Sequence, residues 1–139
     1  MAEKILLVDD DKFLIDMYSL KFSELGYSIE SAMSGAEALE KVSGSLQPDI
    51  CLIDIIMPGM DGFQLIQELA NKGVTGRATV IVLSNLGQKD DIERALTLGV
   101  DGYIVKASST PSEVVAKVKE IAGQKQLKLG RAVPPAFKS

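Results

Sequence analysis

Short apolar runs alternate along the chain with stretches whose apolar residues recur at helical spacing. The runs are too short to form helices, and their aliphatic character is typical of strands buried in a sheet. They predict five strands, over Ile5–Val8, Tyr27–Ala32, Ile50–Ile53, Thr79–Leu83 and Gly102–Val105. The helical stretches predict five helices, over residues 14–25, 34–42, 63–69, 88–98 and 111–121.

Capping residues and periodicity add detail to the helices. Ser34 with Glu37, and Thr110 with Glu113, have the spacing of a capping box. Pro111 fits the first position of the last helix. The side chains that we expect to face the interior are Ile92, Ala95 and Leu96 in the fourth helix, and Val114, Val115, Val118 and Ile121 in the fifth.

This alternation of strands and helices predicts a single α/β domain, with a parallel sheet covered by helices on both faces. We expect the domain to span residues 1–123, because the helical pattern fades after Gly123. Residues 124–139 are expected to form a C-terminal tail or linker. A docked segment stays open as the alternative, since this stretch contains Leu127, Leu129, Val133 and Phe137.

Composition and charge narrow the function classes. The 139 residues and 46% hydrophobic content suit one globular domain, and a net charge of −4 argues against nucleic acid as the main partner. The chain contains no histidine, which excludes histidine-based catalysis and histidine metal ligands. Cys51 lies in an apolar run and is expected to be a buried small hydrophobe rather than a reactive thiol. With no signal-peptide pattern and no run near the ~18 apolar residues of a membrane span, we expect a cytoplasmic protein without membrane insertion.

Polar residues stand where the predicted strands end. Asp9 and Asp10 follow the first strand, Asp54 the third, Ser84 the fourth and Lys106 the fifth. The carboxyl ends of parallel strands share one edge of a sheet, where ligands bind. Three close carboxylates favour a bound cation, and Mg²⁺ fits because it uses few carboxylates and accepts phosphate oxygens. A carboxylate can also attack phosphorus, while the ion, the ammonium and the hydroxyl neutralise the phosphoryl oxygens.

Each of these residues also has a simpler explanation. The acidic run Asp9–Asp11 could be a solvated loop, with Asp11 capping the helix that follows. Asp54 could be a turn residue, Ser84 a loop cap and Lys106 a surface charge. Their joint placement at four strand ends favours a functional site.

Four segments together resemble the receiver domains of two-component signalling. They are Ile5–Asp11 (ILLVDDD), Leu52–Gly62 (LIDIIMPGMDG), Val82–Ser84 (VLS) and Gly102–Lys106 (GYIVK). They occur in the order and at the spacing of that family, and the match covers roughly residues 3–123. The resemblance implies a chemotaxis-type, flavodoxin-like fold with five helices and the strand order 2-1-3-4-5.

The resemblance also assigns roles to individual residues. It implies that Asp54 is the phosphoacceptor and that Asp9 and Asp10 hold Mg²⁺ together with Asp54 and the backbone carbonyl of Ile56. Lys106 and Ser84 are expected to contact the phosphoryl oxygens, and Ser84 is expected to move toward them. Tyr103 then matches the aromatic position that changes rotamer on activation, with ordinary strand packing as the alternative.

The implied function is a phosphorylation-dependent switch that catalyses only its own phosphorylation and dephosphorylation. The expected donor is a phosphohistidine on a sensor histidine kinase or phosphotransfer protein. The signal is expected to leave through the surface of the fourth helix, fifth strand and fifth helix, toward a target protein or a covalently attached output domain. We expect no direct nucleic-acid binding by this domain, and dimerisation on phosphorylation stays open.

Some residues depart from the common receiver pattern. Ala107 follows Lys106 where many receivers have a proline after a cis peptide bond, so that loop geometry is not carried over. Asn85 stands where alanine is frequent and is expected to narrow access to Asp54. The apolar Ile56 and Leu86 flank the site and offer no group to orient water, so the hypothesis is a long-lived phosphorylated state.

Two other classes of protein share parts of this pattern. An aspartate-dependent phosphohydrolase would have a second aspartate two residues after the nucleophile, where this chain has Ile56. A flavodoxin-like cofactor carrier would need a phosphate-binding loop after the first strand, and the acidic run Asp9–Asp11 would repel phosphate instead. The sequence therefore favours the receiver over both.

Overall fold

The computed structural model describes residues 3–130. The five predicted strands form one parallel sheet. The strands are β1 (Lys4–Val8), β2 (Ser28–Ala32), β3 (Ile50–Ile53), β4 (Thr79–Ser84) and β5 (Gly102–Val105). Their order in the sheet is β2-β1-β3-β4-β5, and every neighbouring pair is parallel. The expected fold and strand order are confirmed.

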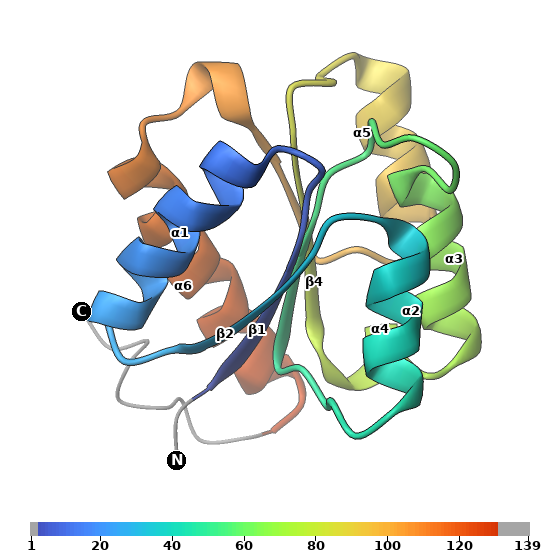
Figure 1. Ribbon diagram of the computed structural model, residues 1–139. Helices are drawn as coiled ribbons and strands as arrows, with labels where there is room; N and C mark the ends of the chain where they lie inside the picture. Colours follow the sequence, from blue (N-terminus) through green and yellow to red (C-terminus); the bar gives the residue numbers. More distant parts are fainter. Residues whose placement is uncertain (1–2, 131–139) are drawn as a thin grey trace.

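Helices cover both faces of this sheet (Figure 1). The helices are α1 (Lys12–Glu24), α2 (Gly35–Ser43), α3 (Gly62–Asn71), α4 (Val74–Arg77), α5 (Lys89–Thr97) and α6 (Pro111–Lys128). On one face lie α1 and α6, and on the other lie the remaining four. The side chains of successive strand residues alternate between two buried clusters, one beneath each helical layer.

Two helices differ from the sequence prediction. The single turn α4 was not predicted, because four residues are too few to show a helical period. Helix α6 runs on to Lys128 instead of fading after Gly123, and Gln126 is buried within it. Residues 124–128, expected in a tail, are therefore helical, whereas Val133 and Phe137 lie outside the described residues.

Most side chains predicted for the interior are buried, with one clear exception. Ala95 and Cys51 are fully buried, Ile92 and Ile121 are half-buried, and Leu96 is 52% exposed. The prediction for Leu96 was wrong because Ala95, one residue earlier, already faces the core. Leu98 and Val100, just after α5, pack against the core instead.

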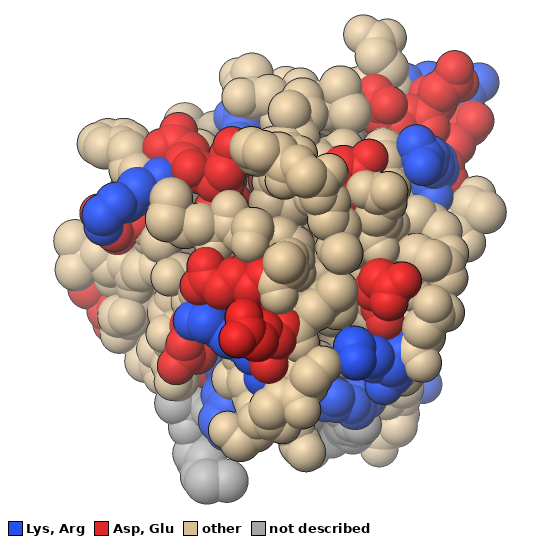
Figure 2. Space-filling view, turned by 45° about the vertical axis from the view of Figure 1, so that its right-hand side comes forward, with Lys and Arg blue, Asp and Glu red and all other residues tan. Residues whose placement is uncertain are grey.

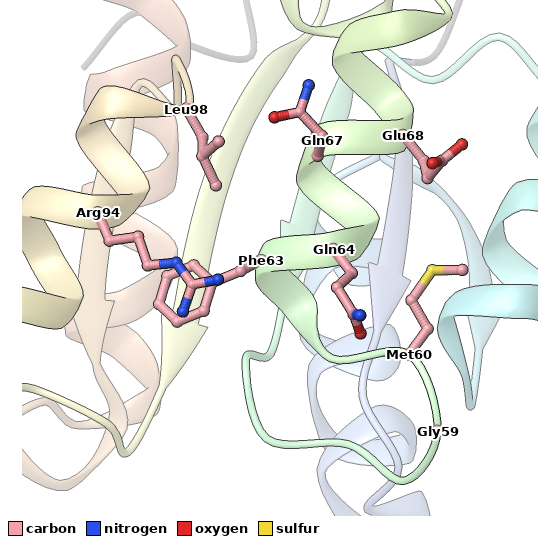
Figure 3. Close-up of a pocket in the computed structure, with 8 residues that line it drawn as sticks. All are labelled: Gly59, Met60, Phe63, Gln64, Gln67, Glu68, Arg94 and Leu98. Atoms are coloured by element: carbon pink, nitrogen blue, oxygen red, sulfur yellow. The ribbon is translucent and has the colours of Figure 1, made fainter.

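The face formed by α2, α3 and α5 carries charges of both signs. Acidic and basic side chains are interspersed over the view in Figure 2. Between α3 and α5 the surface is hollowed into a groove of about 530 Å³, lined in part by Phe63 and Arg94 (Figure 3). No helix among residues 3–130 is both long and apolar enough to span a bilayer.

Candidate functional site

The predicted polar residues meet at the carboxyl edge of the sheet. Asp9 and Asp54 directly follow β1 and β3, which are paired so that Val8 lies opposite Ile53. Ser84 is the last residue of β4. Lys106 begins a short 3-10 turn after β5. Because all four strands run in the same direction, their ends bring these side chains to one place.

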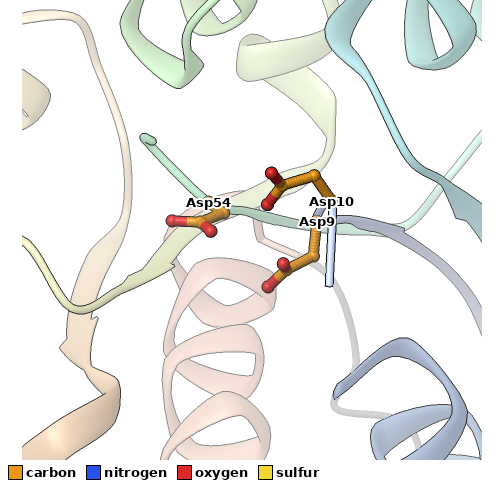
Figure 4. A group of neighbouring side chains, drawn as sticks. All are labelled: Asp9, Asp10 and Asp54. Atoms are coloured by element: carbon orange, nitrogen blue, oxygen red, sulfur yellow. The ribbon is translucent and has the colours of Figure 1, made fainter. Parts of the chain in front are cut away.

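Three carboxylates form the centre of the site (Figure 4). One oxygen from each of Asp9, Asp10 and Asp54 lies within 4.8 Å of the other two. Asp9 and Asp54 are buried, whereas Asp10 is exposed at the rim. A set of oxygen-only donors with one side open to solvent fits a hard divalent ion such as Mg²⁺, which keeps part of its water shell.

Lys106 reaches into this cluster from β5. Its Nζ donates to Asp9 Oδ2 at 2.6 Å and to Asp54 Oδ2 at 3.3 Å. Burial acts to lower the pKa of Lys106, but the hydrogen bond that its ammonium donates to Asp9 and the charge of Asp54 outweigh this effect, and the net pKa is raised. The ammonium therefore stays charged and compensates only part of the surrounding negative charge.

The carboxyl group of Asp9 has a shifted pKa. Burial raises its pKa above the usual value, and the charge of Asp54 acts in the same direction. Hydrogen bonds from Lys106 and from the Asp11 backbone N–H, 2.9 Å from Asp9 Oδ1, oppose this effect. The cluster therefore holds more negative charge than its own hydrogen bonds stabilise.

Local backbone contacts fix the acidic residues. The Asp11 side chain caps α1, as expected, by accepting from the N–H groups of Phe13 and Leu14. On the β3 side, Gly62 packs so closely that a Cβ at this position would lie 2.3 Å from the Asp54 carbonyl oxygen. Only glycine permits this approach, and it sets the path of the loop between Asp54 and α3.

Ser84 and Tyr103 meet at one residue of the loop after β4. The Leu86 N–H donates to Ser84 Oγ at 3.3 Å, and the Tyr103 hydroxyl donates to the Leu86 carbonyl. Ser84 is fully buried and Tyr103 half-buried. A movement of Ser84 would thus change the hydrogen bond that holds Tyr103.

The residues flanking the site differ in their placement. Ile56 is 59% exposed, and its N–H donates to Asp54 Oδ1 at 3.4 Å. Asn85 is exposed, and Leu86 is half-buried. The peptide bond between Lys106 and Ala107 is trans.

Two residues near the site were missed in the sequence. Gly62 was noted only as part of a turn, because its contact with the Asp54 backbone depends on tertiary packing. Tyr18 of α1 was counted among the apolar residues of its helix. Burial raises the pKa of its phenol, and the charges of Lys106 and Asp9 act on this pKa as well.

Comparison with known proteins agrees with this geometry. A model of the response regulator receiver domain matches residues 5–119. The chain belongs to this family. It therefore contains a receiver domain of two-component regulatory systems, consistent with a phosphorylation-dependent signalling switch.

Relatives of known type support the assignment. The "DNA-binding dual master transcriptional regulator RpaA" of Synechocystis sp. is 30% identical over 118 residues, which cover 85% of this receiver and 48% of the relative. The "Probable transcriptional regulator ycf27" of Guillardia theta is 34% identical over 119 residues, which cover 86% and 45%. The chain thus spans about half the length of these relatives.

A solved structure has the same fold. The CheY-like response regulator receiver domain protein of Methanospirillum hungatei JF-1 superposes with a TM-score of 0.83 and 25% identity, covering 92% of this chain and 99% of that one. The similarity over nearly the whole neighbour confirms the receiver fold.

Proposed function

We propose that Asp54 is the phosphoacceptor of this receiver domain and that it works with Mg²⁺ bound by Asp9, Asp10, Asp54 and the backbone carbonyl of Ile56. The observation that carries the proposal is the cluster of three carboxylates within 4.8 Å, contacted by the one ammonium of Lys106 among the residues that the structure describes. This surplus of negative charge favours a bound divalent cation. Asp54 would then lie next to both that cation and the Lys106 ammonium.

The proposed reaction moves a phosphoryl group from a phosphohistidine to Asp54. An Asp54 carboxylate oxygen forms the new P–O bond as the P–N bond to the histidine breaks, and the electron pair leaves with the imidazole nitrogen. Bound Mg²⁺ would supply charge neutralisation on the phosphoryl oxygens. Lys106, which already contacts Asp54, would donate to the same oxygens, and Ser84 would do so from β4.

Phosphorylation would then act through the loop after β4. The new acceptor oxygens would draw the Ser84 hydroxyl away from the Leu86 N–H, and the Leu86 carbonyl would shift relative to Tyr103. The surface of α5, β5 and α6 would change with them. This is a shift between two packings rather than a rigid switch.

The partners follow from this role. The donor would be a sensor histidine kinase or a phosphotransfer protein, and the recipient of the signal a target protein or an attached output domain. We infer a cytoplasmic regulator whose only catalysis is its own phosphorylation and dephosphorylation, without direct nucleic-acid binding by this domain.

The test is incubation with acetyl phosphate and Mg²⁺, followed by intact mass measurement. We expect one added phosphoryl group per chain in the native protein and none in Asp54→Ala. Asp16→Ala is the matched control, because Asp16 is an exposed carboxylate on α1 whose ion pair with Lys12 is also exposed. An unchanged native mass would contradict the proposal, as would equal labelling of Asp54→Ala.

A further inference from the structure

The sheet ends at β2, which is one of its two edge strands. Within residues 3–130, β2 is paired with β1 on one side and with no strand on the other. In Figure 1 it runs along the front of the sheet between α1 and α2, and neither helix passes in front of it. An edge strand presents backbone N–H and C=O groups that can pair with another strand.

Alternate residues of β2 direct their backbone groups outward. The Ser28 N–H donates to the Glu3 carbonyl at 2.9 Å, so residues 28, 30 and 32 are the ones bonded to β1. Ile29 and Ser31 therefore face away from the sheet. In the described part of the chain, no hydrogen bond is found for the Ile29 N–H, the Ile29 carbonyl or the Ser31 N–H. These three groups are available to a further strand.

Lys41 of α2 lies across the same edge. Its Nζ donates to the Ser31 carbonyl at 2.7 Å and to Glu30 Oε2 at 3.1 Å. One turn earlier on α2, Glu37 Oε1 accepts from the N–H of Met33, the residue after β2, at 2.9 Å. Two side chains of one helix thus occupy outward backbone groups at the carboxyl end of this edge, whereas the earlier part of the strand stays unpaired.

A second copy of β2 fits this edge about a two-fold axis. When two β2 strands run antiparallel with Ile29 opposite Ser31 of the other copy, each such pair exchanges two N–H···O bonds. Of the groups that this register uses, the Ser31 carbonyl is the one already occupied, by Lys41. The register also places the two Glu30 side chains directly opposite each other, where like charges destabilise the pairing.

We propose that β2 is a pairing edge for β2 of a second copy, and that Lys41 and Glu30 keep it unpaired. Lys41 occupies a backbone acceptor that the pairing needs, and its side chain lies where the second strand would run. Glu30 opposes the pairing through its negative charge at the two-fold axis. The edge shares no residue with the acidic cluster, so this inference is independent of the phosphorylation of Asp54.

The test measures self-association of the whole chain by sedimentation equilibrium, without Mg²⁺ or a phosphoryl donor. Glu30→Thr/Lys41→Ala removes both obstacles, and threonine suits a strand. Glu30→Thr/Lys12→Ala is the matched control, because Lys12 is an exposed lysine of α1 that also pairs with a carboxylate. We expect the native protein to be monomeric, and the dissociation constant of the first variant to be at least tenfold lower than that of the control.

Amide hydrogen exchange locates the contact. In the native monomer the Ile29 and Ser31 amides should exchange faster than the Ser28 amide, which is bonded to β1. In Glu30→Thr/Lys41→Ala both outward amides should become protected as the protein concentration rises. Adding Ser31→Pro removes an N–H that β1 does not use, and should abolish the dimer together with the protection of Ile29.

Different results overturn different parts of the proposal. Slow exchange of Ile29 in the native monomer, which needs no variant, would overturn the unpaired edge. If Glu30→Thr/Lys41→Ala stayed monomeric, or if its association survived Ser31→Pro, pairing through β2 would be wrong. Equal association of the two double variants would overturn the role of Lys41. Concentration-dependent protection of Ile29 in the native chain would do the same, because the edge would then pair with Lys41 in place.

Discussion

Two half-buried lysines in this protein contact carboxylates at opposite edges of the same sheet. At the carboxyl edge, Lys106 contacts Asp9 and Asp54, with Asp10 also in the cluster. At the opposite edge, Lys125 Nζ lies 2.9 Å from Asp101 Oδ1. The side chains of the two lysines are buried to nearly the same extent, with 11% and 10% exposed.

The two sites differ in how well their charges balance. Lys125 faces one carboxylate and also donates to the Thr75 carbonyl, while Asp101 also accepts from the Val80 N–H at 2.9 Å. Charges and hydrogen bonds are therefore matched, and the pair joins α6 to the rest of the fold. At the carboxyl edge, three carboxylates lie around the ammonium of Lys106. The negative charge that Lys106 leaves uncompensated favours the binding of a further cation. Balance marks a structural contact here, and imbalance marks a binding site.

The largest effect is expected where backbone packing supports the unbalanced site. Gly62→Ala would place a Cβ against the Asp54 carbonyl and the Ile55 Cα, and should lower the free energy of unfolding by about 3 kcal/mol. Urea denaturation measures this loss. Gly76→Ala is the control, since nothing lies within 4 Å of a Cβ there. Equal stability of the two variants would show that the loop yields freely.

The balanced pair should respond as a structural contact. Lys125→Met removes hydrogen bonds to the half-buried carboxylate of Asp101 and should lower the free energy of unfolding by about 2 kcal/mol. Lys12→Met, which breaks an exposed pair with Asp16, should cost less than about 0.5 kcal/mol. If the two variants lost similar amounts of unfolding free energy, the Lys125–Asp101 pair would contribute no more to stability than a surface ion pair.

The unbalanced site should respond in the opposite direction. Asp54→Asn removes a like charge next to Asp9 and should raise the unfolding free energy by about 1 kcal/mol in Mg²⁺-free buffer near neutral pH. Because the folded pKa of Asp9 is raised, its contribution to stability is present at low pH and is lost as pH rises through that pKa. In Asp54→Asn, Asp9 loses less of this stabilisation as pH rises, because the neighbouring negative charge is absent. The difference in unfolding free energy between the variant and the native protein should therefore be small near pH 4 and should grow toward pH 7. A destabilised variant, or a gain largest in acid, would argue against charge surplus.

The smallest effect concerns the residue at the rim. Ile56→Asn introduces an amide that can orient water near Asp54, and should shorten the half-life of the phosphorylated chain about threefold, equivalent to about 0.7 kcal/mol of activation free energy. The decay of the phosphorylated mass after removal of acetyl phosphate gives the half-life. Leu96→Asn changes an exposed apolar residue of α5 and should leave it unaltered. An unchanged lifetime in Ile56→Asn would count against shielding by Ile56.

The sequence allowed the sheet and the acidic cluster to be predicted because both depend on local patterns. Strand ends can be read from apolar runs, and parallel strands bring Asp9, Asp54 and Lys106 to a shared edge without further information. The capping role of Asp11 is equally local and was also predicted.

The missed features depend on contacts between distant segments. Lys125 and Asp101 are 24 residues apart and pair only because α6 passes the start of β5. The stacking of Arg94 on Phe63 likewise requires α3 and α5 to lie next to each other. The apolar periodicity of α3 or of α5 does not show that the two helices are neighbours in the fold. The extension of α6 to Lys128 was missed for the same reason, because tertiary contacts of Lys125 support a stretch whose apolar pattern is weak.

The most direct test of the contrast between the two edges is a Mg²⁺ titration followed by amide NMR shifts. Charge surplus at the carboxyl edge predicts saturable shifts confined to the neighbourhood of Asp9, Asp10, Asp54 and Ile56, strongly reduced in Asp10→Asn, with Asp101 and Lys125 unaffected. Shifts that do not saturate, or that appear equally around Lys125, would contradict it.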